Sequence, residues 1–218
     1  MRKLLLSLTL LALTPIQAAP FEDSIAQRAL ACTQCHGKEG RAGPDGYYPR
    51  LAGKPQGYLY NQLLNFRDGR RHYGLMTELI APLSDAYLLE LASYFASLDL
   101  PYPAARGDGR PAPALLLQGD RQRQLPACVA CHGQKLSGMQ PAIPGLLGLP
   151  RDYLIGQLGA WRTGQRRAQA PDCMGEIARR LRPEEVAELA QWLAAQPVPA
   201  DYKPQPSAPL PQRCGTQP

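Results

Sequence analysis

The sequence predicts an all-α protein made of two tandem helical domains and a short tail. Three observations lead to this fold class: the chain repeats itself after about 96 residues, each copy carries apolar residues at helical spacing, and no segment alternates convincingly as a strand would. A repeat of this length is too long for a solenoid unit and fits a duplicated domain. We expect a signal peptide over 1–18, domains over 19–104 and 105–196, and a proline-rich tail over 197–218.

The internal repeat is carried by several aligned segments and by one pair of methionines. Residues 31–37 align with 127–133, 49–53 with 144–148, 58–69 with 153–164, Met76 with Met174, and 83–95 with 181–193. The second copy has a few extra residues before its methionine. Agreement at so many positions indicates duplication rather than chance.

The first helix of each copy should deliver a cysteine-rich segment. Residues 22–34 form a plausible helix that opens near Asp23 or Ser24, both acceptable N-cap residues. In the second copy this helix is less clear, because Gly119 and Pro126 interrupt the approach.

The middle and last helices of each copy carry apolar stripes that predict core packing. The middle helices present Leu59, Leu63 and Phe66, or Leu154, Leu158 and Trp161; the last helices present Leu88, Leu91 and Phe95, or Val186, Leu189 and Leu193. Gly69 and Gly164 are placed to end the middle helices. Ser84 can cap one last helix, and Pro183 suits the first turn of the other.

Two segments rich in helix breakers fall outside the repeat. Residues 100–113 read as an extended linker between the domains. Residues 197–218 hold seven prolines in 22 residues and no periodicity, which predicts a wrapping or disordered segment rather than a third domain.

The N-terminus has the composition of a secretory signal peptide. Arg2 and Lys3 form a charged start, residues 4–13 an apolar core, and a small-residue cleavage site lies near Ala18. The apolar run is shorter than the ~20 residues that span a bilayer, so we expect cleavage and export to the periplasm rather than a retained membrane anchor.

The charge of the expected mature chain is modest. Removing 1–18 takes away two of the 24 basic residues and none of the 18 acidic ones, so the formal charge falls from +6 to +4. This is ordinary for a soluble protein, and no basic stripe with interleaved aromatics points to nucleic acid. Aromatics make up only 7% of the chain, which is lean for two independent cores.

The pentapeptide Cys32-Thr-Gln-Cys35-His36 returns as Cys128-Val-Ala-Cys131-His132. This spacing is the attachment signature of haem c: two cysteines on one turn form thioethers with the porphyrin, and the following histidine binds the iron. The lean composition agrees, because a covalently held porphyrin adds apolar mass to a small core. A zinc site or a thiol redox pair is the alternative, but the pairs lie 96 residues apart and no βαβ pattern surrounds either.

Each haem iron needs a sixth ligand, and two methionines are candidates. Met76 and Met174 lie 40 and 42 residues after their histidines, just before the last helix of each copy. A methionine thioether raises the reduction potential of the iron and closes it to substrates. Met139 has no counterpart in the first copy and reads as a loop or gap-filling residue, and His72 reads as an exposed loop histidine rather than an iron ligand.

Residues around the ligands can be assigned supporting roles. A ligating imidazole usually donates its second N–H to a carbonyl, and the segments that begin at Pro49 and Pro144 are candidates to present it. Arg67 and Arg162 occupy matching positions and could pair with haem propionates, or could be solvated surface charges.

Taken together, these residues resemble a dihaem class I cytochrome c, and most closely the cytochrome c4 type. The resemblance is carried by residues 32–37, 49–53, 58–69 and 76–85, by the corresponding segments of the second copy, and covers nearly all of 24–195. It implies two cytochrome c folds related by an approximate two-fold axis, each wrapped around one haem c, with the haem propionates facing each other. It also implies a periplasmic one-electron carrier that serves respiratory partners.

The chain departs from that family at two cysteines. Cys173 stands directly before Met174, where the family commonly has another methionine, and Cys214 lies in the tail. The two could form a disulfide over a span of 41 residues, which the loop-entropy view values at roughly 4 kcal/mol at most. Alternatively, the Cys173 thiolate could replace Met174 as iron ligand.

Electron transfer through two His/Met haems is therefore the expected function, with no catalytic residue. A dihaem enzyme of the peroxidase or thiosulfate-oxidising type is the alternative, although only three histidines exist and two are committed to iron. A third possibility is a cytochrome subunit permanently bound to a dehydrogenase or reductase, with the tail as a docking strap. The expected partners are periplasmic or membrane-bound redox proteins, through which the chain could associate with a membrane surface.

Overall fold

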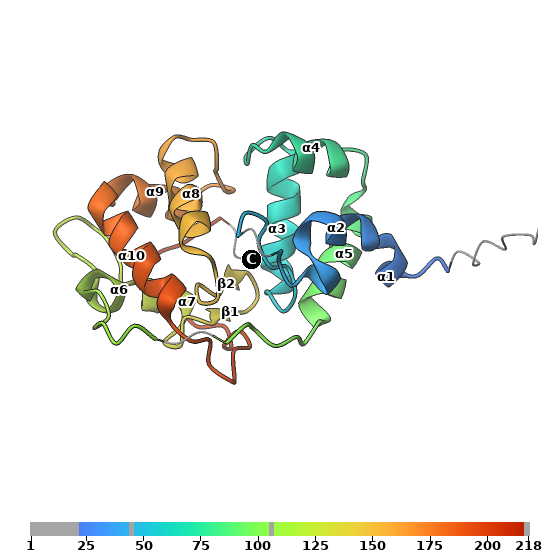
Figure 1. The fold of residues 1–218 in the computed structure, drawn as a ribbon. Helices are drawn as coiled ribbons and strands as arrows, with labels where there is room; N and C mark the ends of the chain where they lie inside the picture. Colours follow the sequence, from blue (N-terminus) through green and yellow to red (C-terminus); the bar gives the residue numbers. More distant parts are fainter. Residues whose placement is uncertain (1–21, 44–45, 105–106, 216–218) are drawn as a thin grey trace, which may run out of the picture.

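The structure is a computed structural model that describes residues 22–43, 46–104 and 107–215. The predicted signal peptide and its cleavage site lie outside these residues. The described residues form two helical lobes side by side, as Figure 1 shows. The all-α prediction is confirmed, and among the described residues no helix is long and apolar enough to cross a membrane.

The N-terminal lobe and the C-terminal lobe repeat the same order of elements. The first contains α1 (Ile25–Arg28), α2 (Leu30–His36), the short 3-10 helix η1 (Lys38–Gly40), α3 (Gln56–Arg67), α4 (Gly74–Ile80) and α5 (Asp85–Ser97). The second contains α6 (Ala114–Gln118), α7 (Cys128–His132), α8 (Arg151–Arg162), α9 (Cys173–Arg180) and α10 (Pro183–Ala195). Helices α2 to α5 correspond to α7 to α10 in the repeat.

The first predicted helix is broken in two. Ser24 caps α1 by accepting a hydrogen bond from the amide of Gln27 at 3.3 Å, but the helix is interrupted at Ala29 and restarts as α2. The second part continues beyond the predicted end to His36. The prediction of one continuous helix over 22–34 was wrong in this respect.

The C-terminal lobe also contains a small sheet that the sequence did not reveal. Strands β1 (Gly138–Met139) and β2 (Ile143–Pro144) pair in an antiparallel hairpin. Met139 is therefore in a strand rather than a loop, and its side chain is buried. Strands of two residues are too short to produce an alternating pattern, which explains why none was visible.

The middle and last helices begin and end where the sequence predicted. Gly69 and Gly164 follow the last turns of α3 and α8 with φ of 71° and 77°, a conformation that glycine adopts without strain. The Ser84 hydroxyl caps α5 by accepting from the amide of Tyr87, and Pro183 is the first residue of α10. The apolar stripes on these helices form the cores of the two lobes.

The two lobes meet along a short two-fold contact. Arg71 and Arg166, which occupy equivalent repeat positions, form an antiparallel bridge. On either side of it, the amide of His72 donates to the carbonyl of Gln165 at 2.8 Å, and the amide of Arg167 donates to the carbonyl of Arg70 at 2.6 Å. The contact therefore joins matching loops, each just after a middle helix.

The tail wraps around the molecule instead of extending from it. Its backbone pairs with the hairpin, because the amide of Gln205 donates to the carbonyl of Gly138 and the amide of Gln140 donates to the carbonyl of Gln205, both at 2.8 Å. A disulfide then joins Cys214 to Cys173 at the start of α9.

The start of α10 is held by a buried carboxylate. Glu185 accepts two hydrogen bonds from the Arg123 guanidinium, at 2.7 and 3.0 Å, and one from the Arg182 amide at 2.8 Å. The hydrogen bonds from Arg123 lower the pKa of Glu185 to about 2. The carboxylate therefore ties the segment before α7 to the last helix.

We expect Glu185→Gln to destabilise the holoprotein by roughly 1–3 kcal/mol at pH 7, because charged hydrogen bonds are lost from a buried site. Since the folded-state pKa lies below the unfolded value of about 4.3, this contribution is complete above about pH 5 and is lost as the pH falls toward 2. Denaturant unfolding of both proteins at pH 7 and pH 3 should therefore show a smaller difference at pH 3.

Asp152→Asn is the matched control, because its side chain is 90% exposed and pairs only with its neighbour Arg151. Exposed pairs contribute little, so this variant should unfold like the parent at both pH values. An equal effect of the two substitutions would contradict the assignment to Glu185.

Candidate haem sites

The first cysteine pair lies on helix α2, with its histidine at the end of that helix. Cys32 and Cys35 are one turn apart, so both side chains lie on the same side of the helix. His36 is buried, and its Nδ1 lies 2.8 Å from the carbonyl oxygen of Pro49. With Nδ1–H donated to this carbonyl, Nε2 is left with its lone pair available to a metal.

The second pair repeats this geometry on helix α7. Cys128 and Cys131 are again one turn apart, His132 is buried, and its Nδ1 lies 2.8 Å from the carbonyl oxygen of Pro144. Pro144 is held in place by strand β2. The hydrogen bonds expected from the sequence therefore form in both lobes, and burial lowers the pKa of both histidines, which favours the neutral, metal-binding form.

The environment of the cysteines argues against the thiol alternatives. Burial raises the pKa of the Cys128 thiol to about 11 and also raises the pKa of Cys32 and Cys131. Redox-active cysteines have the opposite shift, because their chemistry needs the thiolate. In the part of the chain that the structure describes, no three residues among His, Cys, Asp and Glu cluster as a zinc site would require.

A cavity of about 620 Å³ opens beside the first pair. Cys32, Cys35 and His36 line it, and Met76 lines it from helix α4. Apolar side chains from α3 and α5 complete its walls, among them Leu59, Leu63, Leu91 and Phe95. A large apolar cavity with two thiols, an imidazole and a thioether at its walls fits a covalently bound haem.

Met174 occupies the matching place in the second lobe. It is the second residue of α9, whereas Met76 is the third residue of α4, and both are partly buried. Asp172 fixes the start of α9, because its carboxylate accepts from the amides of Gly175 and Ala168, each at 3.0 Å. The sequence alternative His72 is exposed, and its backbone amide serves the contact between the lobes.

Two arginines between the lobes, the buried Arg166 and the half-buried Arg71, form the part of the site that the sequence did not predict. Arg71 donates to the side-chain oxygens of Gln62 and Gln157 at 2.9 and 2.6 Å, and Arg166 donates to the same two oxygens at 2.9 and 2.8 Å. Arg166 is only 4% exposed, and burial lowers its pKa. Neither guanidinium has a carboxylate partner among the described residues.

Lys54 adds a further buried cation to this boundary. Its ammonium lies 5.9 Å from the ring centre of Tyr58, and burial lowers its pKa. Like Arg71 and Arg166, it lines the 620 Å³ cavity. Buried cations are costly unless anions compensate them, so carboxylates such as haem propionates fit this position.

Arg67 and Arg162 have a different role from the one considered for them. Arg67 forms an ion pair with Asp85 at 2.6 Å and donates to the carbonyl of Leu83, and Arg162 donates to the carbonyl of Leu181 at 3.0 Å. Both hold the turn before the last helix of their lobe, so the structure places neither as a propionate partner. Arg71 and Arg166 also occupy matching positions in the repeat, and this match is the feature of the sequence that could have identified them as candidate propionate partners.

A buried donor in the C-terminal lobe supports a second haem there. The indole N–H of Trp161 is buried and has no hydrogen-bond acceptor among the described residues. Trp161 corresponds to Phe66, which lines the cavity of the other lobe, and the Arg166 guanidinium lies 3.8 Å above its ring. An acidic group of a bound haem would supply the acceptor that this donor requires.

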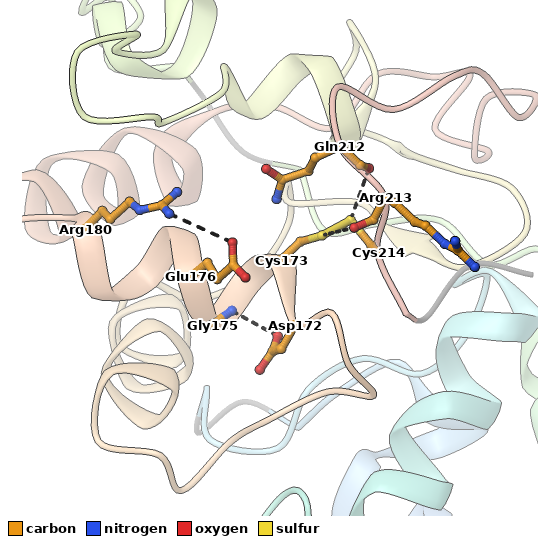
Figure 2. Close-up of a disulfide and its surroundings, with 8 residues drawn as sticks. All are labelled: Asp172, Cys173, Gly175, Glu176, Arg180, Gln212, Arg213 and Cys214. Carbon is orange, nitrogen blue, oxygen red and sulfur yellow. Dashed lines mark hydrogen bonds and ion pairs between the residues drawn. A yellow bond between two sulfur atoms is a disulfide. The ribbon is translucent and has the colours of Figure 1, made fainter.

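A disulfide involves Cys173, the residue directly before Met174, and Figure 2 shows its bond to Cys214 of the tail. Cys173 and Cys214 are bonded at 2.04 Å, with their Cα atoms 5.6 Å apart. Cys173 is therefore not a free thiolate in this structure, which contradicts its role as an alternative iron ligand to Met174. A cross-link over 41 residues also fixes the tail against α9.

Comparison with curated proteins identifies relatives along most of the chain, although no family model matches it. The chain is 37% identical over 206 residues to a "thiosulfate dehydrogenase electron acceptor" of Thiomonas intermedia, covering 91% of this chain and 93% of the relative. It is 34% identical over 203 residues to cytochrome c4 of Pseudomonas aeruginosa, covering 88% and 98%.

Two solved structures have the same fold. Reduced recombinant cytochrome c4 of Pseudomonas stutzeri matches with a TM-score of 0.68 and 27% identity over 81% of this chain and 99% of that one. Thiosulfate dehydrogenase TsdBA of Marichromatium purpuratum matches with a TM-score of 0.67 and 34% identity over 76% of this chain. This chain spans only 36% of the length of that protein.

Replacing Arg71 or Arg166 by glutamine should lower the reduction potential of the adjacent haem by on the order of tens of millivolts. The reason is electrostatic: losing a nearby buried cation favours the ferric iron, which is the more positively charged state. A spectroscopic redox titration of the dihaem protein measures the effect.

Arg67→Gln is the control, since Arg67 is engaged with Asp85 on the outside of α3. It should leave both potentials unchanged. Equal shifts of the reduction potential from Arg67→Gln and Arg166→Gln would contradict the inference that Arg71 and Arg166 lie beside the haems.

Proposed function

Because the chain belongs to the cytochrome c4 family of dihaem class I cytochromes, we propose that it accepts electrons from a thiosulfate-oxidising dehydrogenase in the periplasm. The chain is an electron carrier with two covalently bound haem c groups. What we propose beyond this is the electron donor, a thiosulfate-oxidising dehydrogenase, and the compartment, the periplasm. Its main support is a relative 37% identical over 91% of this chain, which is named as an electron acceptor of such a dehydrogenase.

His36 and His132 are proposed as the proximal iron ligands, and Met76 and Met174 as the distal ones. The haem supplies the one-electron chemistry when bound. The chain's own contribution is to hold each imidazole by one carbonyl, to surround the macrocycle with apolar side chains, and to present buried cations at the lobe boundary. Methionine at both irons would leave no open position for substrate, which favours a carrier over an enzyme.

The proposed periplasmic location rests on two features. The N-terminal composition is that of a signal peptide, and the described chain contains a disulfide, which persists outside the cytoplasm. The predicted domain division at 104 and 105 falls within the extended segment between the lobes and remains a proposal.

The partner is proposed to dock on the N-terminal lobe. Leu75 and Leu79 flank Met76 on α4, are 67% and 45% exposed, and lie at the rim of the haem cavity together with Tyr47. In the C-terminal lobe the position that corresponds to Leu75 is Cys173, where the disulfide attaches the tail. The methionine side of the first haem is therefore apolar and open, whereas that of the second is partly covered.

The decisive test mixes the oxidised dihaem protein with a purified thiosulfate dehydrogenase and thiosulfate in a stopped-flow instrument. We expect rapid reduction of both haems only when dehydrogenase and thiosulfate are both present. Absence of reduction would refute the proposed donor, and reduction by thiosulfate alone would favour the enzyme alternative.

Met76→Ala and Met174→Ala should each remove about half of the red-edge sulfur-to-iron absorption of the ferric protein. Loss of the thioether should also lower the potential of the affected haem, because methionine favours ferrous iron. Met139→Ala is the matched control and should leave the band intact. A full band in the double variant would disprove methionine ligation.

Leu75→Glu combined with Leu79→Glu should slow reduction by the dehydrogenase at least ten-fold, since buried carboxylates in an apolar contact are costly. The equivalent change of an exposed leucine elsewhere, Leu117→Glu on α6, is the control; Leu117 is 50% exposed. Equal second-order rate constants for the two variants would place the docking surface somewhere else.

A further inference from the structure

Two tyrosines connect the segments that support the iron-binding histidines. Tyr102 of the linker and Tyr202 of the tail pack edge to face, with ring centres 5.0 Å apart. Tyr202 packs on the segment 49–53, and Tyr102 packs on the segment 144–148. A methyl group at Gly53 would lie 3.7 Å from the Tyr202 ring, and one at Gly148 would lie 2.5 Å from the Tyr102 ring.

On the N-terminal side, the tail is linked to Arg50. The Tyr202 hydroxyl donates to the carbonyl of Leu100 at 3.0 Å, and the Arg50 guanidinium donates to the same carbonyl. Arg50 is only 3% exposed, and its guanidinium lies 4.0 Å above the Tyr102 ring. It directly follows Pro49, whose carbonyl accepts the hydrogen bond of His36.

On the C-terminal side, the tail is linked to the hairpin. Gln205 exchanges backbone hydrogen bonds with Gly138 and Gln140, and Gly138 pairs with Pro144, whose carbonyl accepts the hydrogen bond of His132. The Gln205 side chain packs on the residue after His132: a methyl group at Gly133 would lie 2.1 Å from its Oε1. Only two residues of the tail, Lys203 and Pro204, thus separate Tyr202 from Gln205, which contact the supports of the two histidines.

The far end of the tail is fixed as well. Cys214 is bonded to Cys173, and the amide of Gly215 donates to the carbonyl of Pro171 at 2.9 Å. Between the end of α10 and this disulfide, the tail cannot move away from the segments that carry Pro49 and Pro144 without losing the contacts made by Tyr202 and Gln205. It is a strap closed at both ends.

We propose that Tyr102 and tail residues 201–205 form a proximal clamp that positions the carbonyls of Pro49 and Pro144. The clamp holds the N–H···O bonds of His36 and His132 short, and so sets the electron donation of each imidazole to its iron. A strong hydrogen bond to the second nitrogen makes the imidazole a better donor, which stabilises ferric iron. Loosening the clamp therefore raises the potential of the haem on the loosened side.

The test uses the dihaem protein and three substitutions in the tail. Tyr202→Phe removes the hydroxyl contacts to the N-terminal side, and Gln205→Pro removes the amide donor to Gly138. Ser207→Ala, further along the tail and outside residues 201–205, is the control, because Ser207 is exposed. Redox titration gives the two potentials, and the ring-current-shifted methyl signals of Met76 and Met174 in NMR spectra assign each potential to a lobe.

We expect Tyr202→Phe to raise the potential of the N-terminal haem alone, Gln205→Pro that of the C-terminal haem alone, and Ser207→Ala neither. If Gln205→Pro yields no holoprotein, Gln205→Ala is measured for the same haem. Unchanged potentials, even with a lower melting temperature, would reduce the tail to a stabilising strap and overturn the proposal. A shift at the opposite haem would overturn it too.

Discussion

The boundary between the lobes depends on two guanidinium groups, those of the buried Arg166 and the half-buried Arg71, which have no carboxylate partner among the described residues. Arg71 and Arg166 share two glutamine oxygens, so each is satisfied in hydrogen bonding but not in charge. Two like charges at such close quarters repel in a medium of low dielectric constant, and only anions can compensate them. The propionates of two bound haems would supply that compensation. The cofactors would then help to hold the lobes together, in a chain whose aromatic content is low.

The orientation of each histidine also depends on a few contacts, here at the end of one short helix. Helices α2 and α7 both end directly at their histidine, because Gly37 and Gly133 follow with φ of 73° and 80°. A side chain at Gly37 would meet the carbonyl oxygen of Ala42 at 2.4 Å, so the turn requires glycine. The chain then folds back to present the proline carbonyl to Nδ1. A short helix, a glycine turn and one carbonyl thus fix the orientation of the imidazole.

Much of this arrangement could be predicted from the sequence, because it depends on local spacing. The cysteine–histidine segments, the helix caps and the proline carbonyls at 49 and 144 all follow from residues close together in the chain. The arginines at the lobe boundary could not be predicted in this way. Arg67 and Arg71 both recur in the second copy, and only the packing of one lobe against the other decides which of them lies at the boundary. The break at Ala29, the hairpin and the path of the tail depend on distant contacts in the same way.

The tail is what makes two similar lobes unequal. A duplicated domain would present the same methionine face twice, but the disulfide to Cys173 covers part of one face, and Leu75 remains exposed on the other. A partner that requires an open apolar face can then approach one haem only. In the proposed docking mode an electron would enter at the N-terminal lobe, which the bridge between Arg71 and Arg166 joins to the other lobe. One docking event would in this way serve both haems in turn.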